Sequence, residues 1–446
     1  MNAKIRARLF YIFIFLFLMV TLFTFFYATG YRFNLTWPLQ FEKILIKTGT
    51  LEIKTEPKNV KVFLEKSTKN IFTNPAKLKG QTTTPVKIRN LLPGEYKLSL
   101  RQDDYWDWEK KINIKTGVFL YLDNITLFKK TLPLNINHSN LQEIYPSPDF
   151  KYAYLSESQT IINLETENQI AQIDEKIKNV TWSKDSKKII SDNLVFDIKN
   201  NSINYFSKNI KGEINNLQCN NEADILNYQQ KQDIKQYNIE KNKDDILVTT
   251  EKTCQDFIIK DDKIAYITND NSSSQIIVTD TNSNKKATID LPLANNYQFI
   301  NPDNEYLNVL EKNHQTLYIL NANLNYAHIV AKIKNFKEGI WISDYQLLYN
   351  NDLEFYMYDI RLNESELITR VSHKINSLLW HSSKQYILYS SNSSLYAIDW
   401  ANRKYTITKI ISLEEIKSPF LNQKNDTVYF SAKIGQQSGL YKMKMQ

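Results

Sequence analysis

The sequence predicts a mainly β protein in three parts: an N-terminal transmembrane helix, a small β-sandwich, and a seven- or eight-bladed β-propeller. Three observations support this prediction. An apolar run lies at residues 9–28, residues 45–130 alternate between apolar and polar side chains, and a turn motif recurs every 36–41 residues from residue 147 onward. Aromatic residues make up 13% of the chain, which also favours strands.

The apolar run at residues 9–28 contains no charged residue and is rich in Phe, Leu and Ile. At about 1.5 Å per residue it spans about 30 Å, the thickness of the hydrocarbon core of a bilayer. A secretory signal cleaved after Gly30 is the alternative, but the apolar region of such a signal is usually about 7–15 residues long. We therefore expect residues 1–30 to be a cytoplasmic stub followed by an uncleaved signal anchor.

The charges that flank this run predict its orientation. Lys4, Arg6 and Arg8 precede it, whereas only Arg32 follows it before Lys43. Because cationic flanks stay in the cytoplasm, we expect the N-terminus inside the cell membrane and the later domains outside it. No second stretch approaches eighteen apolar residues, so a single-pass protein is expected, with residues 31–44 as a juxtamembrane linker.

The remaining charge is unevenly distributed. Residues 45–130 hold 17 Lys and Arg against 9 Asp and Glu, whereas residues 131–446 hold 34 against 38. A basic module beside the membrane would be attracted to anionic headgroups or to acidic wall polymers. A merely soluble, lysine-coated surface explains the same composition equally well. The expected topology makes nucleic acid a poor partner.

Residues 45–130 show the period-two alternation that is typical of strands. Leu51, Ile53 and Thr55 alternate with charged residues, and a second alternating segment covers residues 96–100. The turns Pro57-Lys58-Asn59 and Leu92-Pro93-Gly94 separate such segments. The pattern predicts a compact sandwich of about six strands, with residues 67–84 as a polar excursion.

These motifs resemble the PEGA domain family. The matching residues are Gly49-Thr50-Leu51-Glu52-Ile53 with Pro57, then Gly80 with Thr83-Thr84-Pro85, then Leu92-Pro93-Gly94-Glu95-Tyr96. Two positions depart from the family pattern: Pro57-Lys58-Asn59-Val60 replaces Pro-Glu-Gly-Ala, and Asp104 precedes Tyr105 where a glycine is usual. The resemblance implies an extracytoplasmic β-sandwich that mediates surface-layer or wall interactions rather than chemistry.

Two aromatic residues of this domain are candidates for ligand stacking. Trp106 and Trp108 lie in the cluster Tyr105-Trp106-Asp107-Trp108, and aromatic faces stack on sugars. However, both share the parity of Ile112 and Ile114, so at least one of them is expected in the core.

Residues 131–446 repeat a turn between two apolar strands. Clear copies are Ser147-Pro148-Asp149-Phe150-Lys151 and Trp182-Ser183-Lys184-Asp185-Ser186-Lys187, and weaker ones lie at 220–222, 260–262, 301–304, 341–344, 380–383 and 423–426. Later strands of several repeats end in aspartate, at Asp197, Asp280, Asp359 and Asp399. This period is typical of a β-propeller. The turn resembles that of Tol-associated and WD-repeat-like propellers, whose form is W-S-P-D-G, although every copy here lacks the glycine.

The number of turns favours eight blades, with seven as the alternative. The last repeat, at about 414–446, has room for only three strands. A segment within 124–133, such as Ile125-Thr126-Leu127-Phe128, or one just after it, is therefore expected to supply a fourth strand and close the ring.

The sequence offers no catalytic or cofactor motif. It contains no G-x-S-x-G, H-E-x-x-H or P-loop pattern, and its 9 glycines among 446 residues are few for phosphate-binding loops. His373 with His381, and the turn aspartates, are weighed as metal ligands, but structural and turn-capping roles are preferred. Cys219 and Cys254, 35 residues apart, are candidates for a disulfide, with two buried free thiols as the alternative. No catalytic, cofactor or metal site is predicted.

These observations predict a membrane-anchored extracytoplasmic binding or scaffold protein of a bacterial cell envelope. Residues 9–28 would hold it in the membrane, and the propeller would present an interaction face to a cell-wall polymer or an envelope protein. The alternative is a propeller hydrolase or ligand sensor acting on cell-wall sugars, which requires carboxylates that converge in one pocket.

Overall fold

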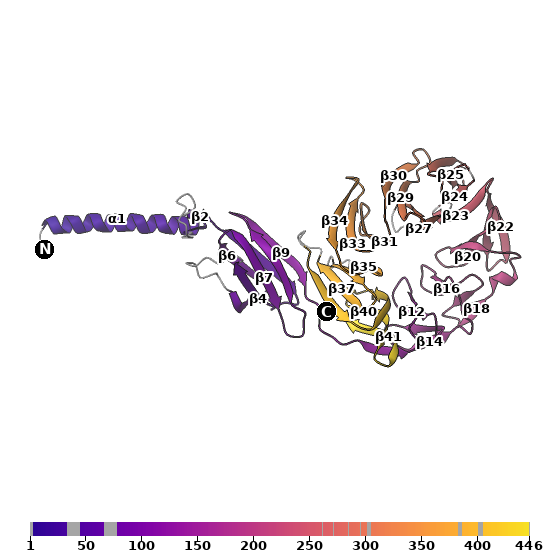
Figure 1. Ribbon diagram of the computed structural model, residues 1–446, viewed down its shortest axis with the longest axis horizontal. Coiled ribbons are helices and arrows are strands. Elements are labelled where there is room, and N and C mark those ends of the chain that lie inside the picture. The colour runs from indigo at the N-terminus through magenta and orange to yellow at the C-terminus, as the bar shows by residue number, and fades with distance from the viewer. Residues whose placement is uncertain are drawn as a thin grey trace.

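The computed structural model describes residues 3–33, 45–66, 78–260, 262–270, 272–283, 285–294, 296–300, 305–381, 386–399 and 405–445. Figure 1 shows three bodies in a row, a long helix, a small β domain and a ring of sheets, which the chain enters in that order. The C-terminus lies where the ring meets the small domain (Figure 1).

The helix α1 (Ala3–Ala28) contains the predicted apolar run. Its segment Arg8–Ala28 has a mean hydropathy of 2.6, and none of this segment is buried against the rest of the chain. A helix of this length and composition can cross a membrane. The expectation of one N-terminal segment suited to span a bilayer is therefore confirmed.

A short ribbon follows the helix. β1 (Tyr31–Phe33) pairs antiparallel with β2 (Leu45–Lys47). The carbonyl oxygen of Gly30 accepts two hydrogen bonds from Thr48, at 2.8 Å from its backbone N and at 2.6 Å from its Oγ1. The linker expected at 31–44 thus begins with a paired strand that brings the start of the small domain against the helix end. Residues 34–44 lie outside the described part of the chain.

The small domain is a sandwich of two sheets. The sheet β6-β3-β9 is mixed, because β3 and β9 run parallel, and the sheet β5-β4-β7-β8 is antiparallel. Its strands are β3 (Gly49–Glu56), β4 (Lys61–Lys66), β5 (Leu78–Thr83), β6 (Val86–Leu91), β7 (Gly94–Arg101), β8 (Trp108–Ile114) and β9 (Phe119–Thr126). Leu51 and Ile53 of one sheet and Leu98 and Leu100 of the other are fully buried in one core, as the alternation predicts.

One strand of this domain was not expected from the sequence. β5 lies within residues 67–84, which are interpreted above as a polar excursion, and it pairs with β4 at the edge of its sheet. Its sequence LKGQTT has a single large apolar residue, so the period-two signal that marks the other strands is absent. Residues 67–77 lie outside the described part of the chain.

The ring consists, in the described residues, of eight four-stranded antiparallel sheets. Seven of them use four consecutive strands. These are the first, β11 (Ile144–Pro146), β12 (Tyr152–Leu155), β13 (Thr160–Asn163) and β14 (Gln169–Gln172); the second, β15 (Thr181–Trp182), β16 (Lys188–Ile190), β17 (Val195–Asp197) and β18 (Ser202–Asn204); the third, β19 (Asn215–Cys219), β20 (Ile225–Gln230), β21 (Asp233–Asn238) and β22 (Lys243–Thr249); the fourth, β23 (Thr253–Lys260), β24 (Lys263–Asn269), β25 (Ser274–Asp280) and β26 (Lys286–Leu291); the fifth, β27 (Tyr297–Ile300), β28 (Leu307–Glu311), β29 (Thr316–Asn321) and β30 (His328–Ile333); the sixth, β31 (Glu338–Trp341), β32 (Gln346–Asn350), β33 (Glu354–Asp359) and β34 (Glu364–Arg370); and the seventh, β35 (Ser377–His381), β36 (Tyr386–Ser390), β37 (Ser394–Asp399) and β38 (Ile407–Ser412).

The eighth sheet closes the ring with strands from both ends of this region. Its order is β10-β41-β40-β39, where β10 (Leu134–His138) precedes the first sheet and the others are β39 (Glu415–Leu421), β40 (Thr427–Ile434) and β41 (Gln437–Lys444). The closing strand is therefore the one just after 124–133. Ile125 and Thr126 belong instead to β9 of the small domain.

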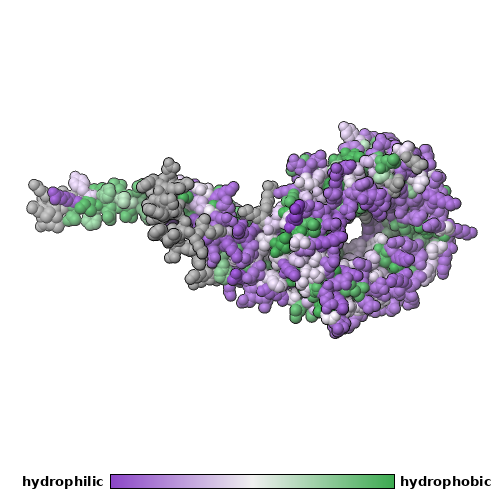
Figure 2. All heavy atoms as spheres, viewed as in Figure 1, coloured by the Kyte–Doolittle hydropathy of each residue, from purple (hydrophilic) through white to green (hydrophobic). Residues whose placement is uncertain are grey.

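The first strands of neighbouring sheets lie side by side around the middle of the ring. Contacts join β19 to β23, β23 to β27, β31 to β35, β35 to β39 and β39 to β11. Figure 2 shows an open channel in the middle of the ring, with mostly hydrophilic residues on the visible face around it. The first strands therefore line the middle of the ring and contact one another from sheet to sheet.

The repeated turn falls between the first and second strands of the sheets. In four copies the residue at the position of the family's glycine has positive φ although it is not glycine: 55° at Phe150, 63° at Ser186, 52° at Ala223 and 57° at Asn425. The sequence motif therefore marks a left-handed turn position that other residues fill at some conformational cost. The predicted copy at 301–304, and residues 382–383 of the copy at 380–383, lie outside the described residues.

The small domain is packed against the seventh and eighth sheets. The Tyr386 hydroxyl donates to the carbonyl oxygen of Thr126 at 3.1 Å and accepts from the Thr126 backbone N at 3.0 Å. Phe128 lies edge to face on the Tyr386 ring and is part of the core of these two sheets. The Lys110 Nζ of β8 lies 3.1 Å from Asp399 Oδ2 at the end of β37. The small domain and the ring are therefore joined both by apolar packing, at Phe128, and by buried polar contacts, at Tyr386 and at the Lys110–Asp399 pair.

Candidate binding groove at the ring closure

The structure separates the two tryptophans that the sequence groups together. Trp108 opens β8 and is 3% exposed in the sandwich core, so its ring is not available to a ligand. Trp106 precedes the strand, is 36% exposed, and has Lys130 Nζ 5.3 Å from its ring centroid. The stacking role proposed for Trp108 is therefore wrong. Only Trp108 of the two lies within β8, so its side chain is on the buried face that also carries Ile112 and Ile114.

Cys219 and Cys254 are free thiols. They lie on the neighbouring strands β19 and β23, but the register keeps them apart: Gln218 Oε1 accepts from Ile259 N, and Asn216 Nδ2 donates to the carbonyl oxygen of Gln255. Cys219 therefore lies about five residues, or roughly 15 Å, along the strand from Cys254. The proposed disulfide is not formed, and burial raises the pKa of Cys254 to about 12, which keeps this thiol protonated.

The two histidines considered as metal ligands serve separate contacts. His373 stacks on Tyr396, with ring centroids 4.5 Å apart, and burial lowers its pKa. His381 is buried, and its Nε2 lies 2.9 Å from the carbonyl oxygen of Asn425. Across the described residues, no group of three His, Cys, Asp or Glu side chains is placed to hold a metal ion.

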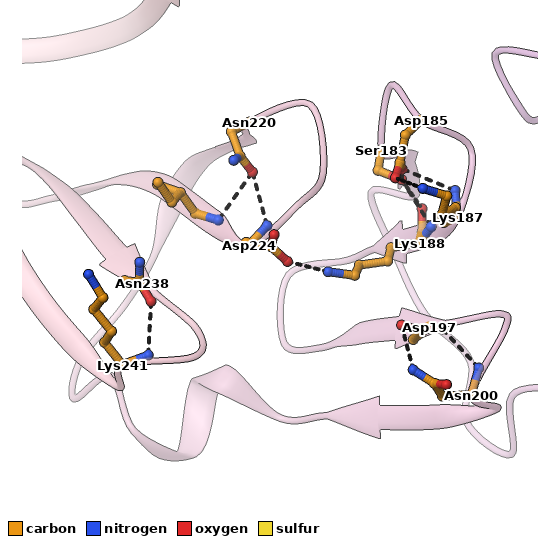
Figure 3. A network of polar contacts seen from close by, with 11 residues as sticks. Ser183, Asp185, Lys187, Lys188, Asp197, Asn200, Asn220, Asp224, Asn238 and Lys241 are labelled. Carbon is orange, nitrogen blue, oxygen red and sulfur yellow. Dashed lines mark hydrogen bonds and ion pairs between the residues drawn. The ribbon is translucent and has the colours of Figure 1, made fainter.

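The turn aspartates cap backbone groups and link neighbouring sheets. Ser183 Oγ donates to Asp185 Oδ1 at 2.7 Å and accepts from Lys188 N at 2.9 Å. Figure 3 shows this turn beside the next one, where Asp224 forms an ion pair with Lys188. The same figure shows Asp197 accepting from Asn200 N, at 2.9 Å. These carboxylates are used by the fold itself, in agreement with the capping role preferred from the sequence.

Two carboxyl groups of first strands have raised pKa values. Burial raises the pKa of Asp256 to about 6 and that of Glu338 to about 7. Asp256 Oδ2 accepts from Phe299 N at 2.8 Å, and Glu338 accepts from the backbone of Leu378. Each carboxyl group therefore joins its own sheet to the first strand of the next sheet, so both serve to hold the ring together.

A groove of about 920 Å³ lies at the seam where the eighth sheet meets the first. Its lining residues come from the segment entering β10, from two turns of the first sheet, from the β39–β40 turn and from β40 and β41. They are Thr131, Leu132, Leu134, Asp149, Phe150, Lys151, Leu164, Glu165, Glu167, Asn422, Gln423, Lys424, Asp426, Thr427, Tyr429, Lys442 and Lys444. The groove thus exists only because the ring is closed by strands from both ends of the region.

The groove combines an apolar lip with charges of both signs. Leu132 is 84% exposed, Leu134 is 61% exposed and Phe150 is 36% exposed. At the base, the Tyr429 hydroxyl donates to the carbonyl oxygen of Leu164 at 3.2 Å, which ties the two sheets together. An ion pair between Lys442 and Glu167 crosses the same seam. Exposed leucines thus stand beside lysines and carboxylates, a mixture of apolar and charged groups that can contact a polypeptide segment.

Sequence reasoning did not find this groove. Its residues come from five segments that lie between residues 131 and 444, and Leu132 and Leu134 are part of an unremarkable Thr-Leu-Pro-Leu stretch. Only Phe150 carried a signal, because it occupies the turn position where the resembling families have glycine.

Comparison with known proteins finds structures of similar fold but no matching family. No protein-family model and no curated protein matches the chain. Among solved structures, the chain is similar to Porphyromonas gingivalis dipeptidyl peptidase 4 at 12% identity and a TM-score of 0.50, over 69% of this chain and 59% of that one. It is also similar to a structure described as the eukaryotic initiation factor, at 13% identity and a TM-score of 0.50, over 78% of this chain and 93% of that one. The dihydro-heme d1 dehydrogenase NirN in complex with DHE shows 11% identity and a TM-score of 0.45, over 68% and 71%.

At such identities the similarity shows the fold alone. The ring of four-stranded sheets is a β-propeller-type fold. The chain spans 59% of the length of the peptidase, so that protein's activity says nothing about this one.

Proposed function

We propose that the protein is a membrane-anchored extracytoplasmic binding protein of the cell envelope. In this proposal α1 is a single-pass anchor with a cytoplasmic N-terminus, β3–β9 form a PEGA-like sandwich, and the ring is an eight-bladed propeller of the WD-repeat-like or Tol-associated type. The eight sheets and the repeated turn support the blade number, and the motifs around Pro57 and Gly94 support the PEGA-like assignment.

The observation that carries the proposal is the buried junction between the small domain and the ring. Lys110 and Asp399 pair with side chains only 4% and 2% exposed, and Tyr386 bonds both backbone groups of Thr126. Because Thr48 ties the same domain to the helix end, the contacts hold the ring at a fixed offset from the end of α1. Such an arm suits display of a binding surface outside the membrane.

The groove supports an envelope protein as the partner in preference to a glycan. Its exposed lip is aliphatic at Leu132 and Leu134, whereas sugar sites rely on exposed aromatic faces, of which only Phe150 is present in the lip. The hydrolase alternative lacks support from the described carboxyl groups. The two whose pKa burial raises, Asp256 to about 6 and Glu338 to about 7, accept hydrogen bonds from backbone N–H groups of the next sheet.

The anchor and its orientation are tested in isolated cells. Full-length protein is expected to stay in the membrane pellet after carbonate extraction, and exposed lysines of the ring are expected to react with an impermeant reagent in intact cells or spheroplasts. Release by carbonate, or labelling only after lysis, would overturn the anchored and exported arrangement.

The binding surface is tested by site-specific photocrosslinking in the native membrane. A photoreactive residue at Leu132 is expected to give a discrete protein adduct, and Leu134→Glu in the same chain is expected to remove it. The matched control is Leu362, which is 68% exposed on another sheet and is expected to give no such adduct. Equal adducts from both positions, or pelleting with wall sacculi that Leu134→Glu abolishes, would contradict a protein partner at the groove.

A further inference from the structure

We propose that the membrane-side end of the small domain binds the acidic headgroups of the leaflet from which α1 emerges. This membrane-side end consists of the β1–β2 ribbon and the turn at residues 115–118, between β8 and β9. The inference rests on the proposed function, because it requires α1 to span a membrane.

Hydrogen bonds hold this end beside the last residues of the apolar run. Gly30, two residues beyond α1, accepts from both the backbone N and the Oγ1 of Thr48. The carbonyl oxygen of Thr48 in turn accepts from Gly117 N at 3.2 Å. The 115–118 turn is thus connected to the helix end through one residue, and Figure 1 shows β2 beside that end.

The charge of the membrane-side end is positive. Arg32, Lys47 and Lys115 lie here, and Lys47 and Lys115 are exposed. A Cβ added to Gly117 would lie 3.2 Å from Lys47 Cδ, so Lys47 packs directly over the turn. None of the three cations has a carboxylate partner within the part of the chain that the structure describes. Their charge is therefore available to an external anion.

Apolar and aromatic groups accompany these cations, as at a bilayer interface. Val118 is 45% exposed and Tyr27 is 48% exposed, and the Arg32 guanidinium lies 3.6 Å from the centroid of the Tyr27 ring. Tyr and Arg at the end of an apolar helix are typical of the headgroup layer. A cationic cluster held within a Debye length of acidic lipids is attracted to them, and its position favours lipid over the more distant polymers of a wall.

The experiment uses the full-length chain in lipid nanodiscs. Val118→Cys is labelled with an environment-sensitive fluorophore in a Cys219→Ser background, in which the remaining Cys254 is buried. Quenching by a spin label on the lipid headgroups is compared between neutral discs and discs containing phosphatidylglycerol. We expect quenching to be about twofold stronger on the acidic discs and to lose that difference at high salt.

Charge reversal separates the outcomes. Lys47→Glu with Lys115→Glu is expected to abolish the lipid dependence, whereas Lys58→Glu with Lys61→Glu, which changes the charge equally at the ring-facing end, is expected to keep it. Equal quenching on both lipids, equal effects of the two double variants, or sacculus binding that needs Lys47 and Lys115 would overturn the lipid assignment. Failure of the chain to enter discs would instead refute the anchor, and it is scored separately by co-elution with lipid.

Discussion

Lys110 of the small domain and Asp399 of the seventh sheet form a buried ion pair, with Nζ and Oδ2 3.1 Å apart. Lys110 stands on the core face of β8 between Trp108 and Ile112, a face that is otherwise apolar. Asp399 occupies the strand-end position at which Asp197, in another sheet, caps its own turn. One aspartate of a repeated set is thus used to attach the neighbouring domain.

Removing one partner of this pair is expected to destabilise the protein strongly. Lys110→Met leaves the Asp399 carboxylate buried beside an apolar group, at a cost of about 3–5 kcal/mol. Chemical denaturation followed by circular dichroism measures the loss, and limited proteolysis near residues 129–133 reports loosening of the domain junction.

Lys111→Met is the matched control. Lys111 is the next residue of β8 but points outward and is exposed, so its replacement is expected to change stability by no more than about 0.5 kcal/mol. The double change Lys110→Met with Asp399→Leu is expected to recover most of the loss. Similar losses for Lys110→Met and Lys111→Met would show that the pair does not secure the junction.

The sequence predicts most of the fold because the signals are periodic. Alternation identifies β3 and β7, and the repeated turn identifies where the first strand of each sheet ends. β5 was not predicted, because an edge strand forms through backbone hydrogen bonds and needs no apolar face. β1 was not predicted, because its pairing with β2 depends on the return of the chain to the end of the helix.

The sites were less predictable because they combine distant segments. The position of Lys110 in the alternating pattern marks it as a cation on the core side, and this signal was available in the sequence. Nothing local distinguishes Asp399 from Asp280 or Asp359, so its partner required the structure. The groove likewise depends on ring closure between β10 and β41.

The buried carboxyl groups predict a pH-dependent stability. Burial raises the pKa of Asp256 to about 6 and of Glu338 to about 7, above their ordinary values of 3.8 and 4.5. These two groups therefore bind more protons in the folded state than in the unfolded state across this range, so their contribution to the free energy of unfolding falls as pH rises from about 4 to about 7. Denaturation midpoints measured at intervals of pH check this slope.

Glu338→Gln is expected to flatten part of that slope and to raise stability at pH 8, because Gln keeps an acceptor for Leu378 without a charge. Glu354→Gln is the contrasting variant. Hydrogen bonds from Asn351, Tyr356 and Arg370 lower the pKa of Glu354 to about 2, so its contribution is present at neutral pH and lost in acid. If both variants shift the profile in the same direction, burial is not the cause of the Glu338 effect.

The two tryptophans are expected to respond differently to truncation. Trp108→Ala removes a ring that is 3% exposed in the sandwich core and is expected to cost about 3–5 kcal/mol. Trp106→Ala removes a ring that is 36% exposed and whose backbone bond to Phe128 is retained, so a smaller loss of about 1–2 kcal/mol is expected. Thermal unfolding of both variants checks the difference, and a comparable loss for each would place Trp106 in the core as well.

Glycine at a strained turn is expected to stabilise the ring. Gln315, between β28 and β29, has φ of 49° and an exposed side chain, and its carbonyl oxygen accepts from Phe336 N in a bond that glycine keeps. Relief of about 1–2 kcal/mol of left-handed strain outweighs the entropy cost of about 0.5–1 kcal/mol for a more flexible unfolded chain. Gln315→Gly is therefore expected to raise the unfolding temperature by about 1–2 °C. Asn313→Gly in the same turn, where φ is not positive, is expected to lower it. A loss of stability in both variants would mean that the backbone at Gln315 is not strained.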